Sequence, residues 1–288
     1  MESFEKSTVE YIPKLHSEIL RIMDVIDELC EKNNIKYYMI GGTLLGAVRH
    51  GGFIPWDDDF DIIMPRRDFD KFIQCCKNDL PNGYSLRWIS TDKRYWRIFA
   101  KISNDNTRFV ERIGHSGLTD CGIFVDVFPV DDSNGYNKTV QTRKNIIEKV
   151  KVIISSKKDH STLRGWKRAV SYVVPNRMLF TFAHYLMTKD NNKGATYYSN
   201  YGSQYPIKRR TIGKIKVDNG VRIPFEDRFY YAPKDYAAVL TNIFGQNYMQ
   251  LPPEEKRKTH YPLYVKFSDG STIDFDKQTK RLTINDTL

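Results

Sequence analysis

Apolar residues recur at every third or fourth position between residues 4 and 33, as at Leu15, Ile19 and Met23. This spacing predicts an amphipathic helix that packs on the core of the protein. The same spacing over residues 68–80 predicts a second helix, which the Pro-Asn-Gly triplet that follows would end. Both helices are expected to support the fold rather than to carry chemistry.

Short apolar runs bounded by Gly and Pro predict strands around these helices. In the first half of the chain we expect strands at residues 36–40, 57–64, 84–90, 96–103 and 122–130. A short helix is expected at 43–49. Near the end of the chain, residues 221–225 and 230–233 predict short strands or extended loop, 235–244 a helix, and 264–284 a β-hairpin that turns at Asp269-Gly270. This mixture of elements predicts the α+β fold class.

Residues 138–193 differ from the rest of the chain because they are helical in pattern and strongly basic. Pro175, Asn176 and Arg177 interrupt their apolar stretch, so no run of about 20 apolar residues remains and we expect no transmembrane helix. Two interpretations stay open for this basic insertion. It could lie on an anionic membrane surface, or it could present a solvated basic face over a buried helix.

The stretch with the strongest chemical signal is IGGTLLGAVRHGGFIPWDDDFDIIMP, residues 40–65. If residues 57–64 form an extended strand, Asp57, Asp59 and Asp61 share one face, because alternate side chains of a strand point the same way. Neighbouring positions on one face lie about 7 Å apart, which lets two carboxylates reach the same divalent ion. Asp58 would point to the opposite face. We therefore expect a metal site for phosphoryl or nucleotidyl transfer.

A third carboxylate, Asp126, stands inside the apolar run GIFVDVFPV. A lone acid there is costly unless it is paired or binds a cation. One interpretation is a structural Asp that caps a loop. The other is a third acid that faces Asp59 and Asp61 from a neighbouring strand, where it completes the metal shell or accepts a proton from an attacking hydroxyl.

The residues before the acids suit phosphate binding. Gly41 and Gly42 would let backbone amides approach phosphate oxygens, and Thr43 would add a hydroxyl donor. Asp59 and Asp61 offer the oxygen ligands that Mg²⁺ (or Mn²⁺) prefers, and Asp126 would be their third partner. The expected catalytic and metal-binding residues are thus these three acids.

Other known sites do not fit this stretch. A calcium loop needs Gly and Glu where the chain has Ile62 and Asp68, and a phosphate-binding P-loop needs a Lys-Ser/Thr pair where it has Ala47 and Val48. No Cys or His cluster has zinc spacing.

The net charge of +10 and the pI of about 9.2 are consistent with an anionic partner or with a charge that serves solubility alone. A nucleic-acid partner is not expected, because the basic residues do not alternate with aromatic ones as a stacking platform requires. The four cysteines form no C-x-x-C pair, and the start of the chain, MESFEKSTVEY, has no signal-peptide pattern. We therefore expect a reducing, cytoplasmic location.

The stretch GGTLLGAVRHGGFIPWDDDFDIIMPRRDFDKF resembles the signature of the LicD family, and FVDVFPVDD, PFEDRFYYAPKDYAAVL and FGQNYMQLPPEEKRKTHYP resemble later parts of it. The resemblance implies a nucleotidyltransferase-like core with a small mixed sheet flanked by helices, related to fukutin-type sugar phosphotransferases. Together with the patterns along the chain, it leads us to expect four segments: an N-terminal helix (1–33), the catalytic core (34–137), the basic helical insertion (138–200) and a substrate-side segment ending in the hairpin (201–288).

The resemblance also implies an activity. Proteins of this family transfer a phospho-alcohol, typically phosphocholine from CDP-choline, onto a sugar hydroxyl of a surface glycan, with release of CMP. Gly41, Gly42 and Thr43 match the glycine motif, and Asp59, Asp61 and Asp126 match the metal-binding acids. Three further candidates are weaker.

Of those three, Arg49 and Lys101 lie next to the motifs and would bind phosphate, unless they form surface salt bridges. His260 would touch substrate or anchor a loop. The expected partners are a CDP-alcohol donor and a glycan or lipid-linked glycan acceptor. An anionic membrane surface is a further possible partner, and binding to it would place the protein at the inner face of the plasma membrane. Two alternatives remain: nucleotidyl transfer from an NTP to a small acceptor, and a non-catalytic glycan or membrane adaptor.

Overall fold

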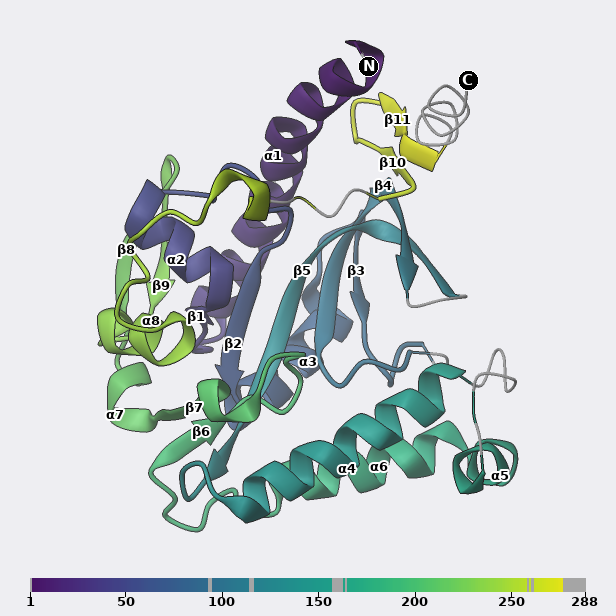
Figure 1. Ribbon diagram of the computed structural model, residues 1–288, viewed down its shortest axis with the longest axis vertical. Helices are drawn as coiled ribbons and strands as arrows, with labels where there is room; N and C mark the ends of the chain where they lie inside the picture. The colour runs from purple at the N-terminus through teal and green to yellow at the C-terminus, as the bar shows by residue number, and fades with distance from the viewer. Residues whose placement is uncertain are drawn as a thin grey trace.

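The computed structural model describes residues 2–92, 95–113, 117–156, 163, 165–257, 259 and 262–276, with the backbone alone for 2–10, 112, 113 and 117. In these residues the chain forms one mixed sheet of nine strands, a separate two-stranded sheet and the surrounding helices (Figure 1). The helices are α1 (Glu2–Lys32), α2 (Gly41–His50), α3 (Arg66–Asp79), α4 (Lys138–Ser155), α5 (Trp166–Val173), α6 (Asn176–Thr188), α7 (Lys214–Val217) and α8 (Tyr236–Phe244), with 3-10 turns η3 (Ile207–Arg210) and η4 (Glu254–Lys256).

The main sheet contains both parallel and antiparallel pairs. Its strands are β1 (Tyr38–Met39), β2 (Asp61–Pro65), β3 (Tyr84–Arg87), β4 (Ala100–Ile113), β5 (Gly117–Ser133), β6 (Tyr197–Ser199), β7 (Thr211–Gly213), β10 (Tyr264–Lys266) and β11 (Thr272–Asp274). The central order is β1-β2-β5-β4-β10-β11, while β3 also pairs with β4 and β6 links β5 to β7. Only β2 and β5 run parallel among the described pairs. The mixed sheet and its helices confirm the predicted α+β class.

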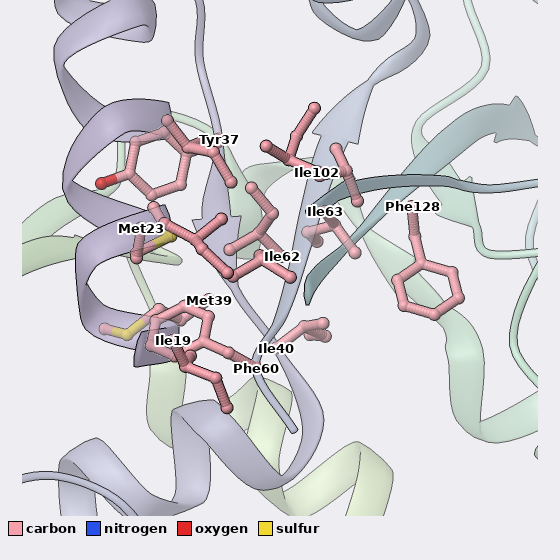
Figure 2. Packing of buried hydrophobic residues seen from close by; sticks show 14 of the residues in the cluster. Ile19, Met23, Tyr37, Met39, Ile40, Phe60, Ile62, Ile63, Ile102 and Phe128 are labelled. Carbon is pink, nitrogen blue, oxygen red and sulfur yellow. The ribbon is translucent and has the colours of Figure 1, made fainter. Parts of the chain in front are cut away.

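The predicted helix over residues 4–33 is α1, and its apolar stripe is buried. Leu15, Ile19 and Met23 are each at most 1% exposed. Figure 2 shows Met23 of this helix near Tyr37 and near Ile62 of β2, while Ile19 lies lower in the view, near Met39 and Phe60. The close packing of these side chains fixes α1 against the strands that carry the acids.

The hairpin predicted at the end of the chain is present as β10 and β11. Gly270 takes a positive φ of +83° in the turn, where a residue with a side chain would be strained. β10 also pairs with β4, which attaches the hairpin to the main sheet. The second sheet is a hairpin of β8 (Val221–Phe225) and β9 (Arg228–Ala232), close to the predicted short strands.

Helices α4, α5 and α6 form a layer along one edge of the molecule, at the opposite end from the N-terminus of α1 and the β10–β11 hairpin (Figure 1). They have an apolar cluster of their own, which includes Ile147, Leu179 and Ala183. No helix in the described part of the chain is both long and apolar enough to cross a membrane.

Some basic residues of this layer face inward, which neither of the two interpretations of the basic insertion anticipated. Arg143, Lys144 and Lys151 are buried. Arg143 pairs with Asp190, and Lys144 donates to the Tyr201 carbonyl at 2.9 Å. These cations hold the layer together and cannot contact a membrane or bulk solvent.

The predicted strand from residue 57 is wrong in its first half. β2 begins at Asp61, and residues 57–60 are irregular. The amide of Asp57 donates to the carbonyl of Ile54 at 2.9 Å, closing a turn that interrupts the extended chain. The alternation of side chains therefore cannot explain how the acids come together. The short helix also begins earlier than predicted, at Gly41 instead of residue 43.

Candidate active site

The N-terminus of α2 meets the acidic stretch through two glycines. Gly41 takes a φ of +63°, and a Cβ there would lie 3.5 Å from Oδ2 of Asp61. A Cβ on Gly42 would collide with Oδ2 of Asp57. Glycine at both positions lets carboxylates approach the first turn of the helix, where the partial positive charge of free amides favours anions.

The loop that carries the acids is fixed from two sides. His16 of α1 stacks on Phe53 with ring centroids 3.8 Å apart, and its Nε2 lies 2.8 Å from the carbonyl oxygen of Asp57. Burial lowers the pKa of His16, so the ring is neutral and Nε2 donates to that carbonyl. On the other side, Oε1 of Glu226 accepts from the Phe53 amide at 2.9 Å, over Gly52, where a Cβ would collide with Glu226.

The parallel pairing of β2 and β5 brings Asp61 and Asp126 together. The two residues are in register, so their side chains lie on the same face of adjacent strands, about 4.8 Å apart at the backbone. The amide of Asp61 donates to the Thr43 hydroxyl at 2.8 Å, and the amide of Asp126 donates to the Phe60 carbonyl at 3.0 Å. The fold thus joins the glycine motif and two predicted acids at one place.

Electrostatic repulsion among these acids is incompletely balanced. Burial and the nearby Asp126 raise the pKa of Asp61 to about 8, although Arg210 and Lys101 oppose the shift. Desolvation by the surrounding protein raises the pKa of Asp59 well above its ordinary value, and Asp61 raises it further. Asp59 as a whole residue is nevertheless exposed, so its segment of chain borders the solvent from which an ion would come.

The chemistry of these side chains suits a hard divalent cation, which would relieve their repulsion and bind their oxygens. In the described residues no three acidic, His or Cys side chains are already arranged to hold a metal. The fit to Mg²⁺ therefore rests on the donor atoms and on the raised pKa values of Asp59 and Asp61, and ion binding would require their side chains to turn toward one another.

Lys101, predicted to bind phosphate, has a carboxylate as its partner. Its side chain is 3% exposed, and Nζ lies 2.7 Å from Oδ1 of Asp126. The same ammonium lies 3.1 Å from the ring centroid of Phe124. Lys101 balances the charge of Asp126, and its contact with phosphate stays a prediction.

Arg49, the other predicted phosphate ligand, lies in the last turn of α2 and contacts the C-terminal part of the chain. Arg49 donates to the carbonyls of Tyr248 and Gln250, at 3.2 Å each, and so fixes the loop after α8 instead of forming a surface salt bridge. His260 lies outside the described residues. Its neighbour Thr259 donates to the Trp56 carbonyl at 2.8 Å, just before the acidic run.

Sequence reasoning missed Arg210, the last residue of η3. It is 8% exposed, its charge opposes the raised pKa of Asp61, and its Nη1 would lie 3.7 Å from a Cβ on Gly41. Its Cζ lies 4.7 Å from the ring centroid of Tyr205, and its Nε has no hydrogen-bond partner among the described residues. The sequence IKRR gives no sign that this arginine, rather than Arg209, faces the acids.

Comparison with known proteins defines the class. The family model described as LicD/FKTN/FKRP, nucleotidyltransferase domain, matches residues 34–159, which include the glycine motif and all of the acids. An uncharacterized protein of Rickettsia prowazekii is 54% identical over 87 residues, covering 30% of this chain and 31% of that protein. Ribitol 5-phosphate transferase FKRP of Homo sapiens is 53% identical over 32 residues, or 11% of this chain and 6% of that protein.

A longer match identifies the family. The chain is 30% identical over 259 residues to the lipopolysaccharide cholinephosphotransferase LicD of Haemophilus influenzae, covering 84% of this chain and 92% of that protein. The chain belongs to the LicD family, which confirms the resemblance noted in its sequence, and it is an enzyme of the phosphotransferase class.

Proposed function

We propose that this enzyme transfers a phospho-alcohol from a CDP-alcohol onto a sugar hydroxyl of a cell-surface glycan and releases CMP. The observation that carries the proposal is the pairing of Asp61 and Asp126 on parallel strands, beside the N-terminus of α2. The name of the H. influenzae relative supports phosphocholine as the group and lipopolysaccharide as the glycan. The name of FKRP is the reason to test ribitol phosphate beside it.

In this proposal Asp59, Asp61 and Asp126 hold Mg²⁺ (or Mn²⁺). When bound, the ion would neutralise phosphate charge and orient the leaving group. The support is the set of carboxylate oxygens and the raised pKa values of Asp59 and Asp61. The nearby negative charges and the desolvation that raise the proton affinity of these acids would also favour the binding of a cation.

The donor's phosphates would bind at the positive end of α2. The first turn of α2 carries the amides of Gly41, Gly42 and Thr43, and among the described residues no side chain caps it at Ile40; anions bind readily at such a helix end. The guanidinium of Arg210 lies next to Gly41 and brings a full positive charge. Arg49 would act indirectly, by holding the 248–250 loop.

The proposed reaction is a single in-line displacement. The oxygen of the sugar hydroxyl bonds to the β-phosphorus of CDP-choline while the bond from this phosphorus to the bridging oxygen breaks, and CMP leaves with that oxygen. Lys101 holds Oδ1 of Asp126, which leaves Oδ2 either to bind the ion or, where Asp59 and Asp61 hold the ion alone, to take the hydroxyl proton. Positioning and charge neutralisation then supply most of the catalysis, and no covalent nucleophile is required.

A donor panel tests this proposal against its alternatives. The purified enzyme is incubated with Mg²⁺, a lipopolysaccharide oligosaccharide and either CDP-choline, CDP-ribitol or an NTP. Release of CMP from a CDP-alcohol, with a phosphorylated sugar, is expected. Release of pyrophosphate from an NTP would instead establish nucleotidyl transfer, and failure to bind either donor would favour a non-catalytic adaptor.

The setting that we propose follows from the substrates. Nucleotide-activated donors are used on the cytoplasmic side of the membrane, where a lipid-linked glycan acceptor would be presented. A peripheral position at the inner face of the plasma membrane would bring enzyme and acceptor together. The basic composition of the chain, with a net charge of +10, supports such a position.

A further inference from the structure

The surface of α5 and α6 exposes an unusual number of large apolar side chains. Trp166 and Val173 of α5 are 60% and 79% exposed, and Met178, Phe182 and Tyr185 of α6 are 62%, 47% and 61% exposed. Monomeric soluble proteins rarely leave such side chains grouped unless the surface contacts a partner or a membrane. We call these five residues the α5–α6 apolar surface.

Helical spacing aligns the exposed apolar side chains of α6 instead of scattering them. Met178, Phe182 and Tyr185 are four and then three residues apart, so they form one stripe along α6. A second stripe, one residue further on, is buried in the layer formed with α4: Leu179, Ala183 and Leu186. Thus α6 is apolar on two faces, of which only one has a partner in this chain.

The charged residues along α5 and α6 themselves are of one sign. From residue 160 to residue 189 the sequence contains five Lys or Arg and no Asp or Glu. Arg168 and Arg177 are exposed and take part in none of the ion pairs between described residues. Arg143 and Lys144 are different, because both are buried: Arg143 pairs with Asp190, and Lys144 donates to the Tyr201 carbonyl.

We infer that α5 and α6 lie on an anionic lipid surface, with the α5–α6 apolar surface among the acyl chains and Arg168 and Arg177 at the headgroups. Trp and Tyr favour this interface, where an apolar ring and a polar edge are both satisfied. A second copy of the chain fits less well, because two such surfaces would bring the same positive charges together. The inference concerns a surface apart from the acids and does not depend on the reaction proposed above.

Vesicle co-sedimentation of the full chain tests this inference. The vesicles contain phosphatidylcholine, alone or with phosphatidylglycerol. We expect binding to the anionic vesicles that weakens as salt is raised. Arg168→Gln with Arg177→Gln should lower the partition coefficient about 25-fold, at about fivefold for each basic residue. The matched control, Lys216→Gln with Lys234→Gln, removes two exposed charges elsewhere and should bind as the unmodified chain does.

The apolar contribution needs its own variant. Trp166→Ser with Phe182→Ser should abolish binding, whereas Phe229→Ser, which removes a 58% exposed ring on β9, should not. Circular dichroism verifies that each variant is folded. The inference would be overturned if binding did not depend on anionic lipid. It would also be overturned if Arg168→Gln with Arg177→Gln and Trp166→Ser with Phe182→Ser both bound as the unmodified chain does. It would also be overturned by a concentration-dependent dimer that Trp166→Ser dissociates, because the surface would then join two copies.

Discussion

Replacing Arg210 with methionine tests whether this buried arginine serves the reaction or the fold. Loss of its stacking on Tyr205 costs about 0.5–2 kcal/mol, while removal of a buried, unpartnered Nε returns about 1–3 kcal/mol. The free energy of unfolding should therefore fall by no more than about 1 kcal/mol and could rise by up to about 2.5 kcal/mol. A charge-assisted hydrogen bond to phosphate contributes about 1.5–3 kcal/mol, so kcat/KM for the CDP-alcohol should fall about 10- to 150-fold.

The assay measures kcat/KM for CMP release together with urea unfolding of the same preparations. Arg209→Met is the matched control, since it removes the same charge from the neighbouring, exposed position and should change neither quantity. A different result would refute the reasoning. If Arg210→Met loses about 3–5 kcal/mol of stability and keeps its activity, the arginine is a structural ion-pair partner of Asp61.

Three further predictions follow from the contacts around the site. Gly42→Ala should reduce activity, because the new Cβ would displace the carboxylate of Asp57. The melting temperature should stay nearly unchanged, because alanine favours a helix over glycine by about 1 kcal/mol and so offsets that displacement. Full activity would show that the close approach of Asp57 to Gly42 is unimportant. Because the pKa of His16 is lowered in the folded chain, the unfolded chain binds more protons below pH 6.5, and the free energy of unfolding should fall as the pH drops below that value. His16→Gln should flatten this part of the curve of unfolding free energy against pH. An unchanged curve would contradict the buried, neutral state assigned to His16. Lys101→Met should destabilise the fold by about 3–5 kcal/mol in chemical unfolding, because it leaves the carboxylate of Asp126, which is only 13% exposed, without its cation. A loss below about 1 kcal/mol would show that solvent reaches this pair.

Much of the fold follows from local patterns in the sequence. The stripe that includes Leu15 and Ile19 predicted α1, because a helix repeats about every 3.6 residues and one face must be buried. The pairing of Asp61 with Asp126 could be anticipated too, since each acid stands at or within an apolar strand and a buried acid needs a partner.

The remaining features depend on contacts between distant segments. Asp57 was expected on the same strand face as Asp61, but the chain turns before β2 and brings Asp57 to Gly42. Arg210 reaches the acids only because the strands around η3 fold back onto the sheet. The direction in which Arg143 points is set by Asp190, 47 residues later. The periodicity of apolar residues does not predict such contacts between residues that are far apart in the sequence.

The most direct test of the proposed active site is CMP release from CDP-choline by the unmodified enzyme and by Asp61→Asn, with Mg²⁺ and a lipopolysaccharide oligosaccharide. Removing one of several repelling carboxylates should leave the melting temperature unchanged or higher, because the pKa of Asp61 is raised in the folded chain. The rate should nevertheless fall about 100-fold or more, as when a preorganised charge is lost from a transition state. A folded Asp61→Asn variant that releases CMP within about tenfold of the unmodified rate would contradict the assignment of these acids.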